Sequence, residues 1–325
     1  KNISKDTLLE AIEQSLIQAC KNHFGKADNV KVSINAQTGD FKVVAEKTVV
    51  DLVQDPIMEI ALSDAKRADS RYELGDIVPV EIKSKEFGRI ATQNAKNVIL
   101  QKIREEERKV LFDQYFEKEH DVVTGVVQRY VGRNVSINLG KVDALLTENE
   151  QVKGEKFEPT QRVKVYVLEV KNTTKGPKVM VSRTHPELVK RLFESEVSEV
   201  AEGIVEIKSI AREAGSRTKM AVWSNDPNVD AVGACVGMNG SRVNAVVNEL
   251  NGEKIDVIAY SEDPEAFVKA ALSPAEVKSV SVVPGEKSCR VIVPEDQLSL
   301  AIGREGQNAR LAARLTGYKI DIKTS

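Results

Sequence analysis

The chain has 325 residues, of which 41% are hydrophobic and 30% charged, and its formal net charge is −2. This length predicts two or three ordinary domains or several small ones, and the composition excludes a disordered chain. No run of about 18 apolar residues is present, and the polar start Lys1 to Asp6 lacks the core of a signal peptide. The cytoplasm is therefore the expected location, and no membrane is expected as a partner.

The cysteines and histidines give no sign of a metal site or of catalysis. Cys20, Cys235 and Cys289 are far apart and form no Cys-x-x-Cys pair, so neither a disulfide framework nor a zinc site is indicated. The three histidines are isolated as well, and no Gly-x-x-x-x-Gly-Lys-[Ser/Thr] phosphate loop is present. We expect no cofactor, no metal and no enzymatic activity.

The first 117 residues predict a small α/β domain followed by a long helix. Apolar residues at helical spacing follow a candidate N-cap at Ser4 and predict a helix to about Phe24. Strands are predicted at 30–34, 41–44, 49–53 and 77–82, the first two joined as a hairpin through Thr38-Gly39-Asp40. Residues 90–117 contain neither Pro nor Gly and predict a long, charged helix that serves as a stiff connector.

Residues 118–185 predict a small β-barrel. Five strand-like runs lie at 122–127, 135–139, 144–146, 163–167 and 179–181. Five short strands are typical of an OB-fold, which binds oligonucleotides across one face. This segment carries 12 basic and 8 acidic residues and is the only basic third of the chain.

Arg129, Tyr130 and Arg133 follow the first strand of this barrel and are predicted RNA contacts. An aromatic ring between two cations suits the stacking of a base beside phosphates. The alternative interpretation is an ordinary solvated loop.

Residues 186–325 repeat one pattern. Each copy has Gly-x-x-Gly, a helical stretch and Leu-x-Gly-x-Lys-Ile-Asp, with the loops at 237–240 and 303–306 and the strands at 254–256 and 319–321. Two glycines let the backbone approach a phosphate–sugar chain closely, and the next helix offers free N–H donors. KH domains clamp single-stranded RNA with this loop. One Gly-x-x-Gly alone fits any helical hairpin, whereas the repeat predicts two related domains.

The two loops supply most of the candidate RNA contacts. In the second loop, we expect Arg304 to neutralise a phosphate, Gln307 and Asn308 to donate to sugar or base, and Arg310 to flank the backbone. The first loop lacks such a cation, so Arg242 must supply its charge. The full predicted set is Gly237, Met238, Asn239, Gly240, Arg242, Gly303, Arg304, Glu305, Gly306, Gln307, Asn308 and Arg310. Residues 186–325 carry 17 basic and 21 acidic residues, so binding must come from local donors.

One segment of the first copy is predicted to form an edge strand of its sheet. Arg217 and Lys219 alternate there with Met220 and Val222, which indicates a strand whose charged side chains serve as structural cover.

Longer stretches resemble a known family. Ile302-Gly303-Arg304-Glu305-Gly306-Gln307-Asn308, within 298–317, and residues 229–237 resemble the KH domains of the NusA family of bacterial transcription factors. Residues 87–93, 182–186 and 211–219 resemble the same family, so the resemblance covers essentially the whole chain in order.

The resemblance implies an α+β multidomain protein with an N-terminal polymerase-binding domain, an OB-fold barrel and two tandem type II KH domains. It implies binding to RNA polymerase core and nascent single-stranded RNA, with other elongation or antitermination factors as further partners, and an effect on pausing, termination and antitermination. Two departures are expected: Met238-Asn239 replaces a loop that often has a basic residue, and the acidic C-terminal repeats of some relatives are absent.

The expected domains are 1–117, 118–185, 186–271 and 272–325, with boundaries at the end of the long helix, at His185-Pro186 and at Leu272-Ser273-Pro274. Two other functions use similar modules. An RNA-degrading enzyme such as polynucleotide phosphorylase would need several hundred more residues for catalysis. An adaptor that binds ribosomal RNA would differ only in that its residues 1–117 would not bind RNA polymerase.

Overall fold

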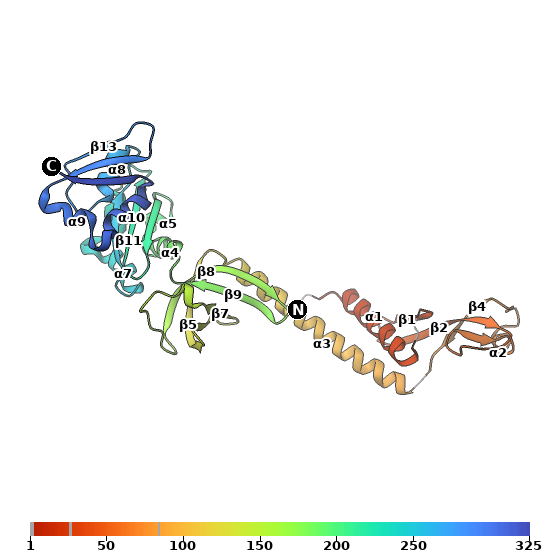
Figure 1. Cartoon of the computed structure of the whole chain (residues 1–325). Helices are drawn as coiled ribbons and strands as arrows, with labels where there is room; N and C mark the ends of the chain where they lie inside the picture. The colour runs from red at the N-terminus through yellow and green to blue at the C-terminus, as the bar shows by residue number, and fades with distance from the viewer. Residues whose placement is uncertain (1–2, 26–27, 84) are drawn as a thin grey trace. The chain divides into compact units, whose positions relative to one another are not determined.

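The computed structural model describes residues 3–25, 28–83 and 85–325. The chain divides into two compact units, Lys1–Val110 and Leu111–Ser325. Figure 1 shows both units and labels many of their helices and strands. Among the described helices, none combines the length and the apolar character that a membrane crossing needs.

The first unit is a four-stranded sheet with helices. In chain order it contains α1 (Lys5–Phe24), β1 (Val30–Ile34), β2 (Phe41–Val50), β3 (Glu59–Ala61), α2 (Leu62–Ala68), β4 (Ile77–Glu81) and most of α3 (Lys85–Phe116). Ser4 caps α1 as predicted, since its Oγ accepts a hydrogen bond from Thr7 N at 3.1 Å. The hairpin of β1 and β2 is confirmed. The strand expected at 49–53 ends at Val50, and β3 and α2 had no clear signal in the sequence.

Two small cores hold this unit together. In the larger one, Leu16 and Cys20 of α1 pack with Val43 and Ala45 of β2. The smaller one forms around Val49 of the same strand. The long helix α3 is confirmed and contributes Ala91 to the larger core.

The second unit begins with the last residues of α3 and a closed five-stranded barrel. Its strands are β5 (Val122–Val131), β6 (Asn134–Asn138), β7 (Asp143–Leu146), β8 (Arg162–Thr173) and β9 (Gly176–Ser182), with a 3-10 turn at Glu148–Glu150. They pair in the order β5-β6-β7-β9-β8, which confirms the predicted OB-fold. Gly125 is required inside the barrel, because a Cβ there would lie 2.3 Å from Ile137 Cγ2.

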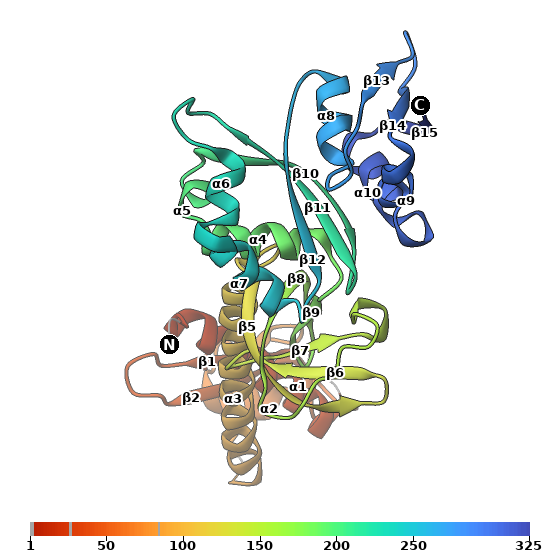
Figure 2. The same cartoon turned by 90° about the vertical axis from the view of Figure 1, so that its left-hand side faces the viewer.

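The first KH domain follows at Pro186, the proline that the sequence placed at a helix start. It contains α4 (Pro186–Glu196), α5 (Ser198–Ala201), β10 (Val205–Glu213), β11 (Arg217–Ser224), α6 (Ala231–Val236), α7 (Ser241–Glu249) and β12 (Lys254–Ala259). The edge position predicted for the strand within residues 212–223 is wrong. β11 is the central strand of β10-β11-β12, and its residues 218–222 are all buried because elements cover both faces of the sheet. Figure 2 shows α4, α6 and α7 on one side of this sheet and α8 on the other.

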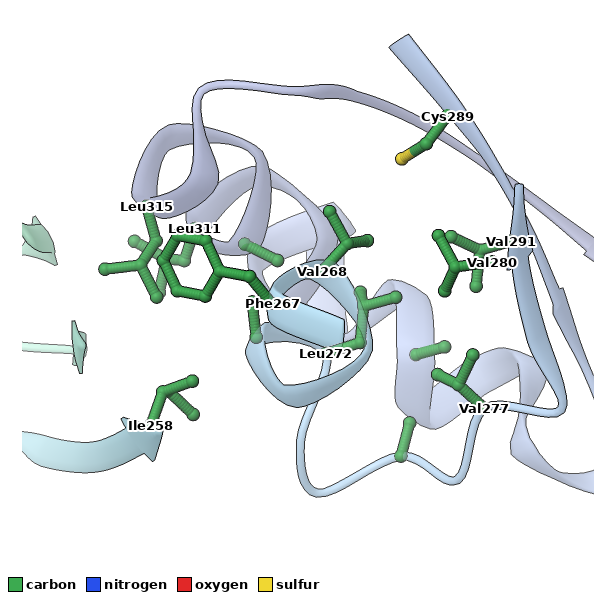
Figure 3. Packing of buried hydrophobic residues seen from close by; sticks show 14 of the residues in the cluster. Ile258, Phe267, Val268, Leu272, Val277, Val280, Cys289, Val291, Leu311 and Leu315 are labelled. Atoms are coloured by element: carbon green, nitrogen blue, oxygen red, sulfur yellow. The ribbon is translucent and has the colours of Figure 1, made fainter. Parts of the chain in front are cut away.

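The second KH domain repeats this topology. It contains α8 (Pro264–Ala271), β13 (Ser279–Val282), β14 (Ser288–Val293), a 3-10 turn (Glu295–Gln297), α9 (Leu298–Ile302), α10 (Gln307–Thr316) and β15 (Lys319–Thr324). In both domains the first strand pair is antiparallel and the second parallel. In Figure 3, Phe267 and Leu272, at α8, lie between Ile258 of β12 and Val291 of β14. One hydrophobic core therefore joins the two KH domains, and α8 packs into it although it precedes the predicted boundary at 272.

A buried arginine joins the barrel to the first KH domain. Arg183 follows β9, and its Nη1 donates to the carbonyl of Lys164 at 2.7 Å while Nη2 donates to the carbonyl of Glu249 at 2.9 Å. It also forms an ion pair with Glu155, and both side chains are at most 5% exposed. Because one side chain satisfies acceptors on both domains, this junction has a fixed geometry.

Candidate nucleic-acid interface

The two Gly-x-x-Gly loops have the same backbone conformation. Gly237 has φ 76° and ψ 171°, and Gly303 has φ 77° and ψ 170°, a region open essentially to glycine alone. Two positions further, Asn239 (φ 51°) and Glu305 (φ 55°) are both left-handed. The sequence repeat is therefore a repeat of three-dimensional structure at the loop itself.

Close contacts explain why the first glycine of each loop has no alternative. A Cβ on Gly303 would lie 2.7 Å from the backbone nitrogen of Asn308, and one on Gly237 would lie 3.0 Å from that of Arg242. The fourth residue, Gly240 or Gly306, is left-handed and directly precedes α7 or α10. Each loop thus leads straight into a helix N-terminus, where backbone N–H groups have no partner within the helix.

The tips of the loops are exposed and chemically different. Met238 of the first loop is 87% exposed, and Asn239 beside it is exposed as well. In the second loop, Arg304 and Glu305 are exposed, and Arg304 forms no ion pair with any residue that the structure describes. The second loop therefore presents a free cation where the first presents a thioether.

Two residues from the predicted contact set point into the protein. Asn308 is only 3% exposed, and its Nδ2 donates to the carbonyls of Leu272 and Ala301, each at 3.0 Å. Arg242, one-third exposed, donates from Nη1 to the carbonyl of Ala234 at 2.7 Å and to Glu199 at 2.9 Å. The donors expected to face RNA are thus used to hold the helix that precedes each loop.

Gln307 and Arg310 lie beside the second loop but contact a carboxylate of the first KH domain. Glu213, at the end of β10, accepts hydrogen bonds from Gln307 Nε2 at 2.8 Å and from Arg310 Nε at 2.5 Å. Arg314 lies 3.7 Å from the same carboxylate. The hydrogen bond from Arg310 holds the pKa of Glu213 below its ordinary value, although burial opposes this shift. No local pattern in the sequence predicts this contact, because 94 residues separate Glu213 from Gln307.

The three predicted barrel residues lie apart from one another. Arg129 lines a groove of about 760 Å³ on the outer face of the barrel. The ring of Tyr130 is 48% exposed, and its hydroxyl accepts a hydrogen bond from Phe157 N at 3.2 Å. Arg133 lies 3.3 Å from Glu148 in a largely exposed ion pair. The structure therefore does not place the ring of Tyr130 between two free cations.

Sequence reasoning missed a polar network in this groove. Gln128 and Asn138 both donate to Asp143 Oδ1, at 3.0 Å and 2.9 Å. The only signal in the sequence was the alternation of polar and apolar residues along β5 and β6, which does not tell which side chains meet.

The side chains of the described residues give no indication of a metal site or of a reactive thiol. Within residues 3–25, 28–83 and 85–325, no group of three or more His, Cys, Asp or Glu is arranged to hold a metal ion. The three cysteines are free and buried. Burial raises the pKa of the Cys235 thiol to about 11, so it is a poor nucleophile at neutral pH.

Comparison with known proteins agrees with this arrangement. Models of the NusA N-terminal domain, of the NusA-like first KH domain and of the NusA-like second KH domain match residues 1–109, 183–260 and 264–325. The chain belongs to the NusA family. The two Gly-x-x-Gly loops lie within the residues that the first and second KH-domain models match.

Full-length relatives extend the match over the barrel. The chain is 53% identical over 324 residues to the transcription termination/antitermination protein NusA of Bacillus subtilis, covering 100% of this chain and 87% of that protein. It is 52% identical to NusA of Halalkalibacterium halodurans, with coverage of 100% and 85%. Identity to NusA of Thermus thermophilus is 44%, with coverage of 99% and 86%.

Proposed function

We propose that this NusA family member is a transcription elongation factor that binds RNA polymerase core and nascent single-stranded RNA and modulates pausing, termination and antitermination. The observation that carries the RNA-binding half is the pair of loops with one backbone conformation, both in the same compact unit. The relatives' names support the transcriptional half. We propose a binding role in the cytoplasm without catalysis, together with other elongation or antitermination factors.

The proposed RNA contacts in the KH domains are the loop backbones and the exposed tips. Gly237, Gly240, Gly303 and Gly306 allow a phosphate–sugar chain to approach the helix N-termini. Arg304 supplies a free cation in the second loop. Met238, Asn239 and Glu305 line the tips. Arg242, Asn308 and Arg310 support the loops through hydrogen bonds to backbone carbonyls, and Gln307 does so through its hydrogen bond to Glu213 of the first KH domain. Arg129, Tyr130 and Arg133 remain proposed contacts of the barrel.

The proposed division of labour follows the predicted domains. Residues 1–117 bind polymerase, 118–185 form the RNA-binding barrel, and the two KH domains follow from 186. The predicted boundary at 272 is less well supported than a start at Pro264, because α8 packs in the core that contains β13 and β14.

The RNA-binding half is tested by reversing the charge of one loop. Arg304→Asp together with Glu305→Asp keeps a residue that tolerates the left-handed conformation and places a negative charge at the tip. Arg290→Asp is the matched control, since it makes the same change on an exposed strand residue outside the loop. We expect affinity for single-stranded RNA to fall at least several-fold in the loop variant and to stay close to the original in the control. Equal losses in the two variants would reject the loop as the contact.

The polymerase half is tested by gel filtration with bacterial core RNA polymerase. Both the full chain and residues 1–117 should co-elute with the enzyme, because the first unit has its own hydrophobic cores. If neither co-elutes while RNA binding persists, the chain is an RNA adaptor outside transcription.

A further inference from the structure

The groove on the outer face of the barrel contains a carboxylate, that of Asp143, which forms no ion pair with a described residue. Asp143 begins β7, opposite Asn138 of β6, which lies opposite Val126 of β5. Their chain neighbours Ala144, Ile137 and Val127 are buried in the barrel, so these three side chains face outward. Among the described residues, no Lys, Arg or His forms an ion pair with Asp143.

Two amides fix the orientation of this carboxylate. Gln128 lies at the irregularity where β5 shifts register between Val127 and Arg129. Gln128 Nε2 donates to Asp143 Oδ1, and Gln128 Oε1 accepts from Ser136 Oγ at 2.9 Å. Such a bulge turns an extra side chain toward its neighbours, here toward the carboxylate.

The second amide is held just as firmly. Asn138 Nδ2 donates to the same Oδ1, and Asn138 Oδ1 accepts from Gly140 N at 2.9 Å. Both amide oxygens are therefore occupied, and each amide nitrogen keeps one hydrogen. Asp143 Oδ2 has no hydrogen-bond partner among the described residues, and the carboxylate lines the groove together with Arg129, Pro159 and Thr160.

A carboxylate in this setting selects against phosphate and for N–H donors. A phosphate oxygen would be repelled by Asp143, whereas a carboxylate can accept two parallel hydrogen bonds. Guanine alone among the four RNA bases presents two adjacent donors, N1–H and the N2 amino group, on its Watson–Crick edge. Adenine and cytosine place an acceptor next to a single amino group, and uracil places N3–H between two acceptors.

The other walls of the groove suit a base and its backbone. Val126 is 36% exposed and offers an apolar surface to the face of a ring. Arg129 lines the groove and supplies a cation for a neighbouring phosphate. We propose that this groove binds one unpaired guanine of the RNA, with Asp143 accepting from its Watson–Crick edge and Gln128 and Asn138 holding Asp143 in position. This inference rests on the proposed RNA-binding function and adds a base preference to it.

The test uses the full chain with both KH loops disabled by Met238→Asp, Asn239→Asp, Arg304→Asp and Glu305→Asp, so that the barrel dominates the signal. Fluorescence anisotropy compares a labelled uridine-rich RNA of about ten nucleotides that contains one guanosine, inosine or adenosine at its centre. Guanosine should bind about tenfold or more tighter than adenosine, as a good bidentate contact discriminates. Inosine, which lacks the N2 amino group, should fall between them. This order of affinities is measured on a chain whose groove residues are unchanged.

Asp143→Asn then removes the preference. The amide cannot accept both hydrogen bonds, so guanosine and adenosine RNA should bind with equal affinity. Glu169→Gln is the matched control, because Glu169 is an exposed barrel carboxylate that pairs with Lys171. Binding without a guanosine preference, or a preference that survives Asp143→Asn, overturns the inference but leaves the RNA-binding function. No binding of any RNA by the chain with intact loops contradicts the proposed function itself.

Discussion

The two KH domains have the same strand pairing, but the charged residues at equivalent strand positions differ in burial. In the first domain, Lys219 of β11 lies opposite Asp256 of β12, and in the second domain Arg290 of β14 lies opposite Asp321 of β15. Lys219 is fully buried and forms an ion pair with Asp256 at 3.0 Å. Arg290 is exposed, and Asp321 pairs instead with Lys323 at 3.5 Å, more than half exposed.

The difference comes from the neighbouring domain. The second KH domain covers the face of the first sheet that carries Lys219, and Lys219 Nζ donates to the carbonyl of Ser273, between α8 and β13, at 2.7 Å. Among the described residues, nothing comparable covers Arg290 of the second sheet. Equivalent strand positions therefore carry a buried ion pair in one domain and a solvated one in the other. Besides the covering of the sheet, the neighbouring residue differs, because Arg217 also pairs with Asp256 at 2.7 Å and Ser288 takes its place in the second domain.

The largest expected effect is the loss of stability when Asp256 is replaced, compared with the same replacement of Asp321. Asp256→Asn leaves Lys219 buried beside a neutral amide and also removes the ion pair between Asp256 and Arg217. It should lower the free energy of unfolding by about 3–5 kcal/mol. Asp321→Asn in the second domain should cost about 1 kcal/mol or less, because its partner is exposed. Urea unfolding followed by circular dichroism measures both. Similar losses in the two variants would show that the burial of Lys219 has no energetic consequence.

The loops should instead behave alike in stability. Gly237→Ala and Gly303→Ala each force a Cβ into a glycine-only conformation and against a backbone nitrogen, so each should cost about 1–3 kcal/mol. Gly306→Ala is a milder comparison, because the nearest atom to its Cβ is the side-chain tip of Arg310 at 3.9 Å. Thermal unfolding checks the three variants. A clear difference between the first two would mean that the loops are not equivalent.

Exchanging the residues at the tips of the two Gly-x-x-Gly loops should move the positive charge from the second loop to the first without changing the fold. Met238→Arg gives the first loop the cation of the second, and Arg304→Met removes it there. Titrations of single-stranded RNA between 50 and 200 mM salt should show a log–log slope steeper by about 0.7 in the first variant and shallower by about as much in the second. An unchanged slope in both would exclude the tips from phosphate contact.

The smallest effect concerns the acid sensitivity of the contact between the domains. The pKa of Glu213 is lowered mainly by its hydrogen bond from Arg310, with burial acting against it. Its contribution to stability is therefore complete above the ordinary glutamate pKa of about 4.3 and is lost as the pH falls through the lowered value. The melting temperature should differ between the original chain and Glu213→Gln at pH 5 to 7 and converge in stronger acid. Glu286→Gln is the matched control in the corresponding hairpin of the second domain, because Glu286 is exposed, and it should leave the melting temperature close to that of the original chain.

The sequence by itself determined the order of the elements and the two loops. The capped helix at Ser4, the long helix, the five barrel strands and the helix at Pro186 all follow from local signals: a cap, an apolar period or a proline. Gly-x-x-Gly also needed no tertiary information, because its conformation depends on the residues immediately next to it.

Only the tertiary structure decided which polar groups are free. Asn308 was predicted to face RNA and instead donates to Leu272 and Ala301, and Lys219 was predicted on an edge and is central and buried. For the Gln128–Asn138–Asp143 network, the alternation along the strands did not show that these three side chains meet. A period of two or 3.6 residues tells which side chains share a face, but the burial and the partners of that face depend on segments that are distant in the chain.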